Sequence, residues 1–206
     1  PRRPLRVMPS LRWLSRPHAP DAFPPVHEAF TEPNGLLAAG GDLAPQRLLT
    51  AYRRGIFPWY EAGQPILWWS PDPRAVLYPD DLKVSRSLRR ALRNAGFAVT
   101  ADTAFDRVVA GCAAPRRYTA ATWITTEMAA AYSRLHRMGW AHSFETWREG
   151  ELVGGLYGVA IGRVFFGESM FSQATDASKV ALVRMVEAVR GRDFALIDCQ
   201  VGSHHV

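Results

Sequence analysis

Two acids and an amide stand where apolar strands are expected. Asp198 and Gln200 follow a short apolar run that begins at Phe194, and Glu168 lies inside the apolar run 163–171. Polar side chains are costly to bury in such a setting unless they are paired. Because Asp198 and Gln200 alternate along a strand end, we expect both side chains to leave on the same face. We therefore expect these polar groups to line one cleft.

The elements that would position these side chains follow one another in a simple order. Beyond residue 80, apolar spacing predicts four helices, and alternation predicts three antiparallel strands in a meander with shorter strands before and after them. Helices interleaved with an antiparallel meander in this way are typical of an α+β fold. The expected helices cover about 85–96, 103–112, 126–139 and 176–190, and the expected strands cover about 97–100, 141–148, 152–160, 163–171 and 194–197.

One face of the expected helix over residues 85–96 is strongly basic. Four arginines at positions i, i+3, i+4 and i+7 share this face. No acidic residue occurs from residue 82 to residue 101. Solvated basic faces usually carry acids one turn away as partners, so we favour phosphate binding over a plain solvated face. The four residues are Arg86, Arg89, Arg90 and Arg93.

The first part of the chain is rich in Pro and aromatic residues. A helix is predicted to begin at Pro45, because Pro suits the first helical position. Trp59, Trp68 and Trp69 follow within a short stretch. They form either the aromatic core of a small domain or a rigid wall for a ligand. Prolines recur over residues 71–79, which predicts a domain boundary there.

Composition and charge narrow the class of protein. The 206 residues are 48% hydrophobic and 21% charged, which is typical of a folded protein that builds its core without disulfides. No apolar run is long enough to span a membrane, and the basic N-terminus lacks the apolar stretch of a signal peptide. Cys112 and Cys199 are expected to be buried free thiols in a cytoplasmic protein. The net charge of +6 favours an anionic partner, with nucleic acid first.

Several stretches are long and unusual enough to identify a family. They occur in the family's order over about residues 23–201. They are EPNGLLAAGGDL (32–43), AYRRGIFPWY (51–60), ILWWSPDPRAVL (66–77), SRSLRR (85–90), TWIT (122–125), LVGGLYGVAIG (152–162), FFGESMFS (165–172), DASKVAL (176–182) and LIDCQV (196–201). On these stretches the chain resembles the leucyl/phenylalanyl-tRNA–protein transferases, bacterial enzymes of the N-degron pathway.

The resemblance implies a fold and a reaction. The implied architecture is α+β, with a small N-terminal α/β domain over residues 1–73 and a GNAT-like acyltransferase domain with a mainly antiparallel sheet over residues 74–206. The implied reaction moves Leu or Phe, and less readily Met, from aminoacyl-tRNA to the α-amine of proteins that begin with Arg or Lys. The modified protein is then marked for degradation. We expect a cytoplasmic monomer that needs no cofactor and does not bind membranes.

The resemblance also implies roles for single residues. Asp198 and Gln200 match the catalytic relay, with the Gln200 amide orienting the attacking amine; the alternative is that Asp198 only stabilises a turn. Glu168 would face the amino group of the aminoacyl residue, since a carboxylate pairs well with an ammonium ion in a closed pocket. The four arginines match a basic cluster that would hold the tRNA acceptor stem by its phosphates. The residues matched to the aminoacyl pocket, each of which ordinary core packing would also explain, are Trp59, Trp123, Leu156, Phe165, Ser169 and Met170.

Other functions fit these residues less completely. A CoA-dependent N-acyltransferase would share the fold class, but it would need a Gly-rich pyrophosphate loop before the helix over 176–190. Residues 173–178 read QATDAS, with no Gly and with an acid at the helix start. A catalytically dead tRNA-binding relative would explain the basic face but not the acids in apolar strands. His204 and His205 lack a spaced third ligand, so no metal site is expected.

The chain departs from the family's pattern at a few places. Family members continue past the LIDCQV strand with a Ser-Leu-Gly-Ala-like stretch and a further strand, whereas this sequence stops at Val206. An exposed edge on the strand that carries Asp198 would then weaken stability and activity. Met8 is the expected start, with residues 1–7 an upstream extension. Ala44 stands where a capping Ser is common, which costs on the order of 1 kcal/mol.

Overall fold

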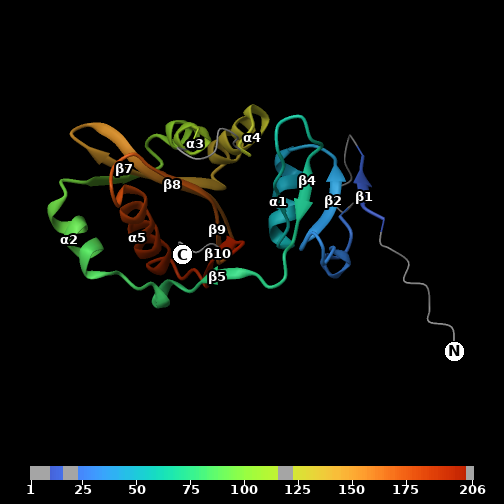
Figure 1. Ribbon diagram of the computed structural model, residues 1–206, viewed down its shortest axis with the longest axis horizontal. Coiled ribbons are helices and arrows are strands. Elements are labelled where there is room, and N and C mark those ends of the chain that lie inside the picture. The colour runs from blue at the N-terminus through green and yellow to red at the C-terminus, as the bar shows by residue number, and fades with distance from the viewer. Residues whose placement is uncertain (1–9, 16–22, 116–122, 203–206) are drawn as a thin grey trace. The chain divides into compact units, whose positions relative to one another are not determined.

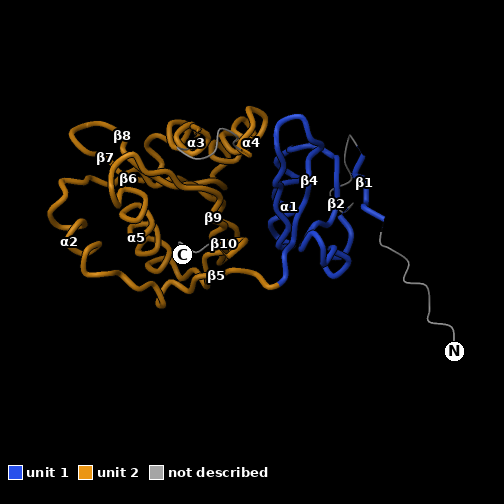
Figure 2. Tube along the Cα trace, viewed as in Figure 1, with its two compact units in different colours: residues 1–72 blue, residues 73–206 orange. Residues whose placement is uncertain are grey.

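The chain folds into two compact units. The computed structural model describes residues 10–15, 23–115 and 123–202. Residues 1–72 form unit 1 and residues 73–206 form unit 2 (Figure 2). The pair His204-His205 lies outside the described residues.

Unit 1 is built on a four-stranded sheet in the order β1-β2-β4-β3. β1 runs parallel to β2, and the other neighbouring strands are antiparallel. The helix predicted to begin at Pro45 is confirmed, and Ala44 supplies no side-chain cap to it. The elements are β1 (Arg12–Leu14), a 3₁₀ turn (Val26–Glu28), β2 (Leu36–Gly40), α1 (Pro45–Arg53), β3 (Phe57–Pro58) and β4 (Leu67–Trp69).

The tryptophans of unit 1 divide between core and surface. Trp68 is fully buried, donates its indole N–H to the carbonyl of Gly40 at 3.0 Å and meets the Phe23 ring edge-on. Trp59 is 47% exposed and packs against Trp69, with ring centroids 5.5 Å apart. The aromatic-core interpretation is therefore confirmed for Trp68, while Trp59 keeps much of its ring at the surface of unit 1.

Unit 2 contains a six-stranded sheet in the order β5-β10-β9-β8-β7-β6. All neighbouring strands are antiparallel except β9 and β10, which run parallel. The mainly antiparallel sheet predicted for this part of the chain is confirmed. The elements are β5 (Ala75–Leu77), a 3₁₀ turn (Pro79–Asp81), α2 (Arg86–Asn94), β6 (Ala98–Ala101), α3 (Phe105–Ala113), α4 (Thr126–Arg137), β7 (Ala141–Arg148), β8 (Glu151–Ile161), β9 (Val164–Ser172), α5 (Ala177–Arg190) and β10 (Leu196–Gln200).

Helices cover both faces of the six-stranded sheet. α3 and α4 lie on one side and α5 on the other (Figure 1). The buried side of α5 packs with strand residues into one apolar cluster, because its apolar residues recur at helical spacing. β8 approaches this cluster closely at Gly158, where a Cβ would lie 2.5 Å from the Phe165 ring. The buried members are Leu156, Phe165, Ala181, Met185, Val186, Val189 and Ile197.

Local capping signals place several helix starts. Ser85 caps the helix that follows it, because its hydroxyl accepts a hydrogen bond from the backbone N–H of Leu88 at 3.2 Å. Thr125 caps α4 in the same way, through the N–H of Met128 at 3.2 Å. The last strand differs from the prediction, since it covers Leu196–Gln200 rather than 194–197. Pairing with both β9 and β5 extends the strand through its polar residues.

Glu145 is a fully buried carboxylate that organises the start of α3. It accepts hydrogen bonds from the hydroxyls of Thr100 and Ser143. It also accepts the backbone N–H groups of Thr103 and Ala104, each at 3.4 Å. These N–H groups lie at the N-terminal end of α3, where the helix dipole favours negative charge. Several donors therefore satisfy this buried carboxyl group.

Asp102 and two histidines form a cluster just after β6. Nδ1 of His142 lies 2.8 Å from Oδ2 of Asp102, and Nδ1 of His136 lies 3.7 Å from Oδ1. The hydrogen bond to Asp102 raises the pKa of His142 above 6.5, against partial burial, which opposes it. Burial alone would raise the pKa of Asp102, but hydrogen bonds from His142 and the Ser143 backbone lower it below 3.8.

This pair is expected to contribute most to stability in mildly acidic solution. The contribution of His142 is complete below about pH 6.5 and is lost as the pH rises through the raised pKa of the folded state. The contribution of Asp102 is lost in the opposite direction, as the pH falls through the lowered pKa of its carboxyl. His142 is 34% and Asp102 39% exposed, so solvent screening limits the effect on the free energy of unfolding to about 1 kcal/mol or less.

Urea unfolding at about pH 6 and about pH 8 measures the effect of this pair. Wild type should lose more of its unfolding free energy between these two conditions than His142→Gln, because the variant has no imidazolium to lose. A variant that loses as much as wild type would show that His142 does not drive the change.

Candidate active site

Two β-bulges occur where β9 and β10 stop pairing. Their parallel pairing ends with Asp198 opposite Phe166. Just beyond this point β9 shifts register against β8, so Glu168 is an extra residue in the strand. β10 shifts register against β5, and Cys199 is the extra residue there. Bulges turn side chains away from the regular alternation of a sheet and are frequent beside active sites.

Glu168 is a buried carboxylate with neutral donors on both oxygens. Its residue exposure is 9%. The Tyr132 hydroxyl of α4 donates to Oε2 at 2.9 Å, and Nε2 of Gln200 donates to Oε1 at 2.9 Å. These two donors fix the orientation of the carboxylate. The arrangement presents a fixed carboxylate at the bulge of β9.

Asp198 is also buried, at 5% exposure, and is held by a bidentate ion pair. Nε of Arg74 donates to Oδ1 and Nη2 donates to Oδ2, both at 2.8 Å. Oδ1 also accepts the backbone N–H of Gln200 at 2.8 Å. Such a fork-to-fork pair fixes the orientation of the carboxylate as well as its charge.

Gln200 departs from the regular alternation of side chains that the sequence predicts for this strand. Its φ is 62°, in the left-handed region, and the register shift lies between Asp198 and Gln200. The Asp198 carboxylate therefore holds the Gln200 backbone, while the Gln200 side chain reaches Glu168. The bond from the Gln200 backbone N–H to Oδ1 of Asp198 fits both interpretations of Asp198, as a residue that stabilises a turn and as a residue that acts through Gln200.

One tyrosine and one cysteine lie next to the network formed by Glu168, Asp198 and Gln200. Tyr157 in β8 is fully buried, and its hydroxyl has no hydrogen-bond partner among the described residues. Burial raises its pKa far above 10, and the charge of Glu168 adds to the shift. Its ring meets that of Tyr132 edge-on at 5.4 Å. Cys199 is free and only partly buried, and burial followed by the charge of Asp198 raises its pKa.

The residues expected in the aminoacyl pocket are only partly brought together. Leu156 and Phe165 are buried in the same apolar cluster. Met170 pairs with Leu156 across β8 and β9 and is 37% exposed, and Ser169 pairs with Tyr157. Leu156 and Phe165 therefore belong to the core under α5, and Met170 is the exposed apolar residue of this set.

The four arginines of α2 lie on its surface. Arg86, Arg89, Arg90 and Arg93 are all exposed, and no residue of the helix is buried. The apolar side of α2 is half-buried, and the helix contacts α5. No ion pair joins these arginines to an acid in the described part of the chain.

Comparison with known proteins identifies the family. A family model described as leucyl/phenylalanyl-tRNA protein transferase matches residues 76–206, and the model for the N-terminal domain of these transferases matches residues 41–72. The chain belongs to the leucyl/phenylalanyl-tRNA–protein transferase family. Relatives of that name from Stutzerimonas stutzeri (strain A1501) and Azoarcus sp. (strain BH72) are 62% and 60% identical. The alignments cover 95% and 94% of this chain and 86% and 81% of the relatives.

Membership of the leucyl/phenylalanyl-tRNA–protein transferase family makes this chain an aminoacyltransferase that moves aminoacyl groups from tRNA to proteins. Among solved structures, L-PGS from Bacillus licheniformis is 11% identical and covers 79% of this chain and 53% of its own, with a TM-score of 0.41. That likeness is too low to define the fold. None of the described helices is long and apolar enough to cross a membrane.

Two tryptophans that the transferase resemblance places in the aminoacyl pocket stand in different units. Trp123 is partly buried just before α4, the helix that carries Tyr132. Trp59 belongs to unit 1, so its place in the pocket stays a prediction. Among the described residues of the transferase, no group of three His, Cys, Asp or Glu side chains could hold a metal ion.

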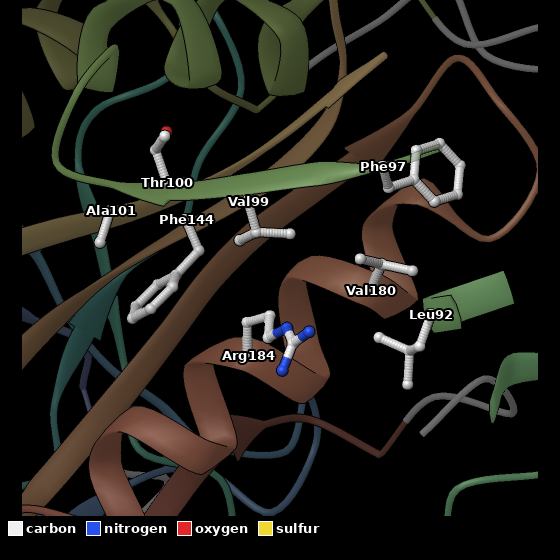
Figure 3. A pocket seen from close by; sticks show the side chains of 8 residues that line it. All are labelled: Leu92, Phe97, Val99, Thr100, Ala101, Phe144, Val180 and Arg184. Carbon is white, nitrogen blue, oxygen red and sulfur yellow. The ribbon is translucent and has the colours of Figure 1, made fainter. Parts of the chain in front are cut away.

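A cavity of about 320 Å³ opens between α2, β6 and α5 of the transferase. Figure 3 shows the Arg184 guanidinium turned toward apolar side chains of this cavity. None of the residues predicted for catalysis or aminoacyl binding lines it. The lining residues are Leu92, Phe97, Val99, Thr100, Ala101, Phe144, Val180 and Arg184.

Sequence reasoning missed two members of the network. Tyr132 reads as an ordinary apolar member of a helix face, although its hydroxyl binds Glu168. Arg74 lies in the matched stretch ILWWSPDPRAVL, but it is 124 residues from Asp198 in the chain. No local pattern pairs residues so far apart.

Proposed function

We propose that this transferase moves Leu or Phe, and less readily Met, from aminoacyl-tRNA to the α-amine of proteins that begin with Arg or Lys, and so marks them for degradation. The observation that carries the proposal is the buried carboxylate of Glu168, fixed by Tyr132 and Gln200 beside apolar strand residues. An aminoacyl donor carries an ammonium group next to an apolar side chain, which complements a carboxylate beside apolar residues.

The donor's amino acid would occupy the Glu168 bulge. The ammonium group would pair with the Glu168 carboxylate, which is a strong interaction once water is excluded. The Leu or Phe side chain would lie against Leu156, Phe165 and Met170, with Ser169 and Trp123 close to the donor. Met170 is unbranched and flexible, so it can adapt to a branched or an aromatic side chain.

The reaction is aminolysis of an ester. The acceptor nitrogen attacks the ester carbonyl carbon, a C–N bond forms, and the C–O bond to the tRNA ribose breaks. The proton lost by the amine goes to the ribose hydroxyl that leaves, so atoms and charge balance without a cofactor. The enzyme must align the acceptor amine with the ester carbonyl and keep that amine neutral. Together these two effects raise the rate by many orders of magnitude.

Gln200 is placed to align the acceptor. Its Nε2 group is used by Glu168, so its carbonyl oxygen is the end of the amide that can accept a hydrogen bond from the attacking amine. An amide is a poor base, so Gln200 orients the amine rather than taking its proton. Asp198 would act through the Gln200 backbone, which its Oδ1 holds at 2.8 Å.

The basic face of α2 would hold the tRNA. Its exposed arginines carry no acid partner in their own helix, and phosphates are the ligands that suit such a face.

We further propose a GNAT-like fold for residues 74–206, a separate N-terminal domain over residues 1–73, and a cytoplasmic monomer. The start of α5 argues against CoA as the donor. The pyrophosphate of CoA would need free backbone N–H groups there, whereas Asp176 places a carboxylate at this position and pairs with Lys179 at 3.1 Å.

A series of acceptor peptides tests the proposed function. With Leu-tRNA or Phe-tRNA as donor, peptides beginning with Arg and Lys should be modified, and the same Arg peptide with an acetylated α-amine should not. Met-tRNA should serve more slowly as donor. Equal transfer to a peptide beginning with Ala would contradict the proposed acceptor class.

A further inference from the structure

We propose that Arg74 is a positioning residue for aminoacyl transfer, which sets the Gln200 amide by clamping the carboxylate of Asp198. The inference rests on the proposed function of this site. The proposed mechanism gives no role to Arg74, which lies at the start of unit 2, directly before β5.

Strand pairing brings Arg74 to the bulge of β10. Its neighbour Ala75 pairs with Gln200, and Val76 pairs with Asp198. The guanidinium therefore stands beside the Asp198 carboxylate and donates to both of its oxygens at 2.8 Å. The planar fork of an arginine matches a carboxylate in a way that a lysine ammonium does not.

Burial makes this pair sensitive to the loss of either partner. The Arg74 side chain is 19% exposed and that of Asp198 8% exposed. Removing one member of a buried ion pair leaves the other charge without its partner, which is strongly unfavourable. The Asp198 carboxylate would then turn toward water or another donor.

The clamp continues through one shared oxygen to the reacting groups. Oδ1 of Asp198 accepts both the Arg74 Nε and the Gln200 backbone N–H. That second bond holds Gln200 at φ 62°, a conformation that non-glycine residues adopt only when their surroundings require it. In this conformation Nε2 of Gln200 reaches Glu168 at 2.9 Å. Arg74 thus fixes the Gln200 amide through Asp198.

Other titratable groups reach the same network from the neighbouring elements. Glu168 comes from β9, Tyr132 from α4, Tyr157 from β8 and Cys199 from β10. Arg74 is the cation that the structure pairs with Asp198.

The test separates catalytic positioning from substrate binding. Arg74→Gln should lower kcat about 100-fold, since a misplacement of about 1 Å costs this much, and should change KM for aminoacyl-tRNA less than about 2-fold. Arg74→Lys should lower kcat about 10-fold, because it keeps the charge and loses the fork. Arg163→Gln is the matched control: it removes an exposed arginine paired with Asp193 and should leave kcat unchanged.

A double variant decides whether Arg74 acts through Asp198. In the Asp198→Asn background, Arg74→Gln should lower kcat by less than about 3-fold further, because the clamp is already broken. The full 100-fold loss in that background would overturn the proposal, as would wild-type kcat in Arg74→Gln. If Arg74→Gln fails to unfold cooperatively, Arg74→Lys decides, and its wild-type kcat would overturn the proposal. A wild type without transfer would instead overturn the proposed function, and this inference with it.

Discussion

Asp198→Asn is expected to slow transfer about 100-fold while tRNA binding is retained. The asparagine has nearly the same shape, but it accepts from one side only and has no charge to offset Arg74. The half-buried guanidinium loses its ion pair with residue 198, and the bond that holds the Gln200 backbone is weakened. Single-turnover transfer of Leu from Leu-tRNA to a peptide beginning with Arg measures the rate directly.

Binding and folding serve as controls for Asp198→Asn. The tRNA dissociation constant should stay within about 2-fold of wild type, because Asp198 is remote in sequence from the basic helix and lies in a different element. A single cooperative unfolding transition would show that the variant is folded. Wild-type turnover in a folded Asp198→Asn protein would remove Asp198 from the mechanism.

Changing Arg86, Arg89 and Arg90 together to Ala is expected to weaken tRNA binding about 100-fold at low salt. Each phosphate contact contributes about 0.7 to 0.9 to the slope of log K against log salt, so the slope should fall by about 2 to 3. α2 has no buried residue, so the folded structure should tolerate the change. Binding titrations at several salt concentrations measure both quantities.

A second triple variant with the same charge change controls for net charge. Arg134, Arg137 and Arg192 are exposed and lie outside α2. Changing them to Ala should alter affinity by less than about 5-fold, through the general field of the protein only. An unchanged salt slope in the α2 variant would refute the assignment of that face to phosphates.

Much of the fold of unit 2 could be predicted from the sequence. The strand over Ala141–Arg148 and the helix ending at Arg190 were placed within a residue or so, because alternation and helical spacing are strong there. The helix predicted over 85–96 begins where Ser85 supplies a side-chain cap. The last strand was placed too early, because polar residues near its end hid the pairing on both of its sides.

The candidate site could be predicted only in its residue types. Glu168, Asp198 and Gln200 were singled out because they are polar in apolar strands, and the structure joins Glu168 to Gln200 and Asp198 to the Gln200 backbone. The two bulges could not be foreseen, since register depends on neighbouring strands rather than on local sequence. For the same reason Arg74 and Tyr132 emerged only from the structure.

Transfer of radiolabelled Leu or Phe from charged tRNA to a peptide beginning with Arg, with acetyl-CoA as a parallel donor, tests the central claim most directly. The site described above predicts transfer from the charged tRNA, none from acetyl-CoA, and a loss of about 100-fold in Glu168→Gln, which keeps the shape but lacks the charge for the donor's ammonium. Acetyl transfer, or full activity in Glu168→Gln, would contradict it.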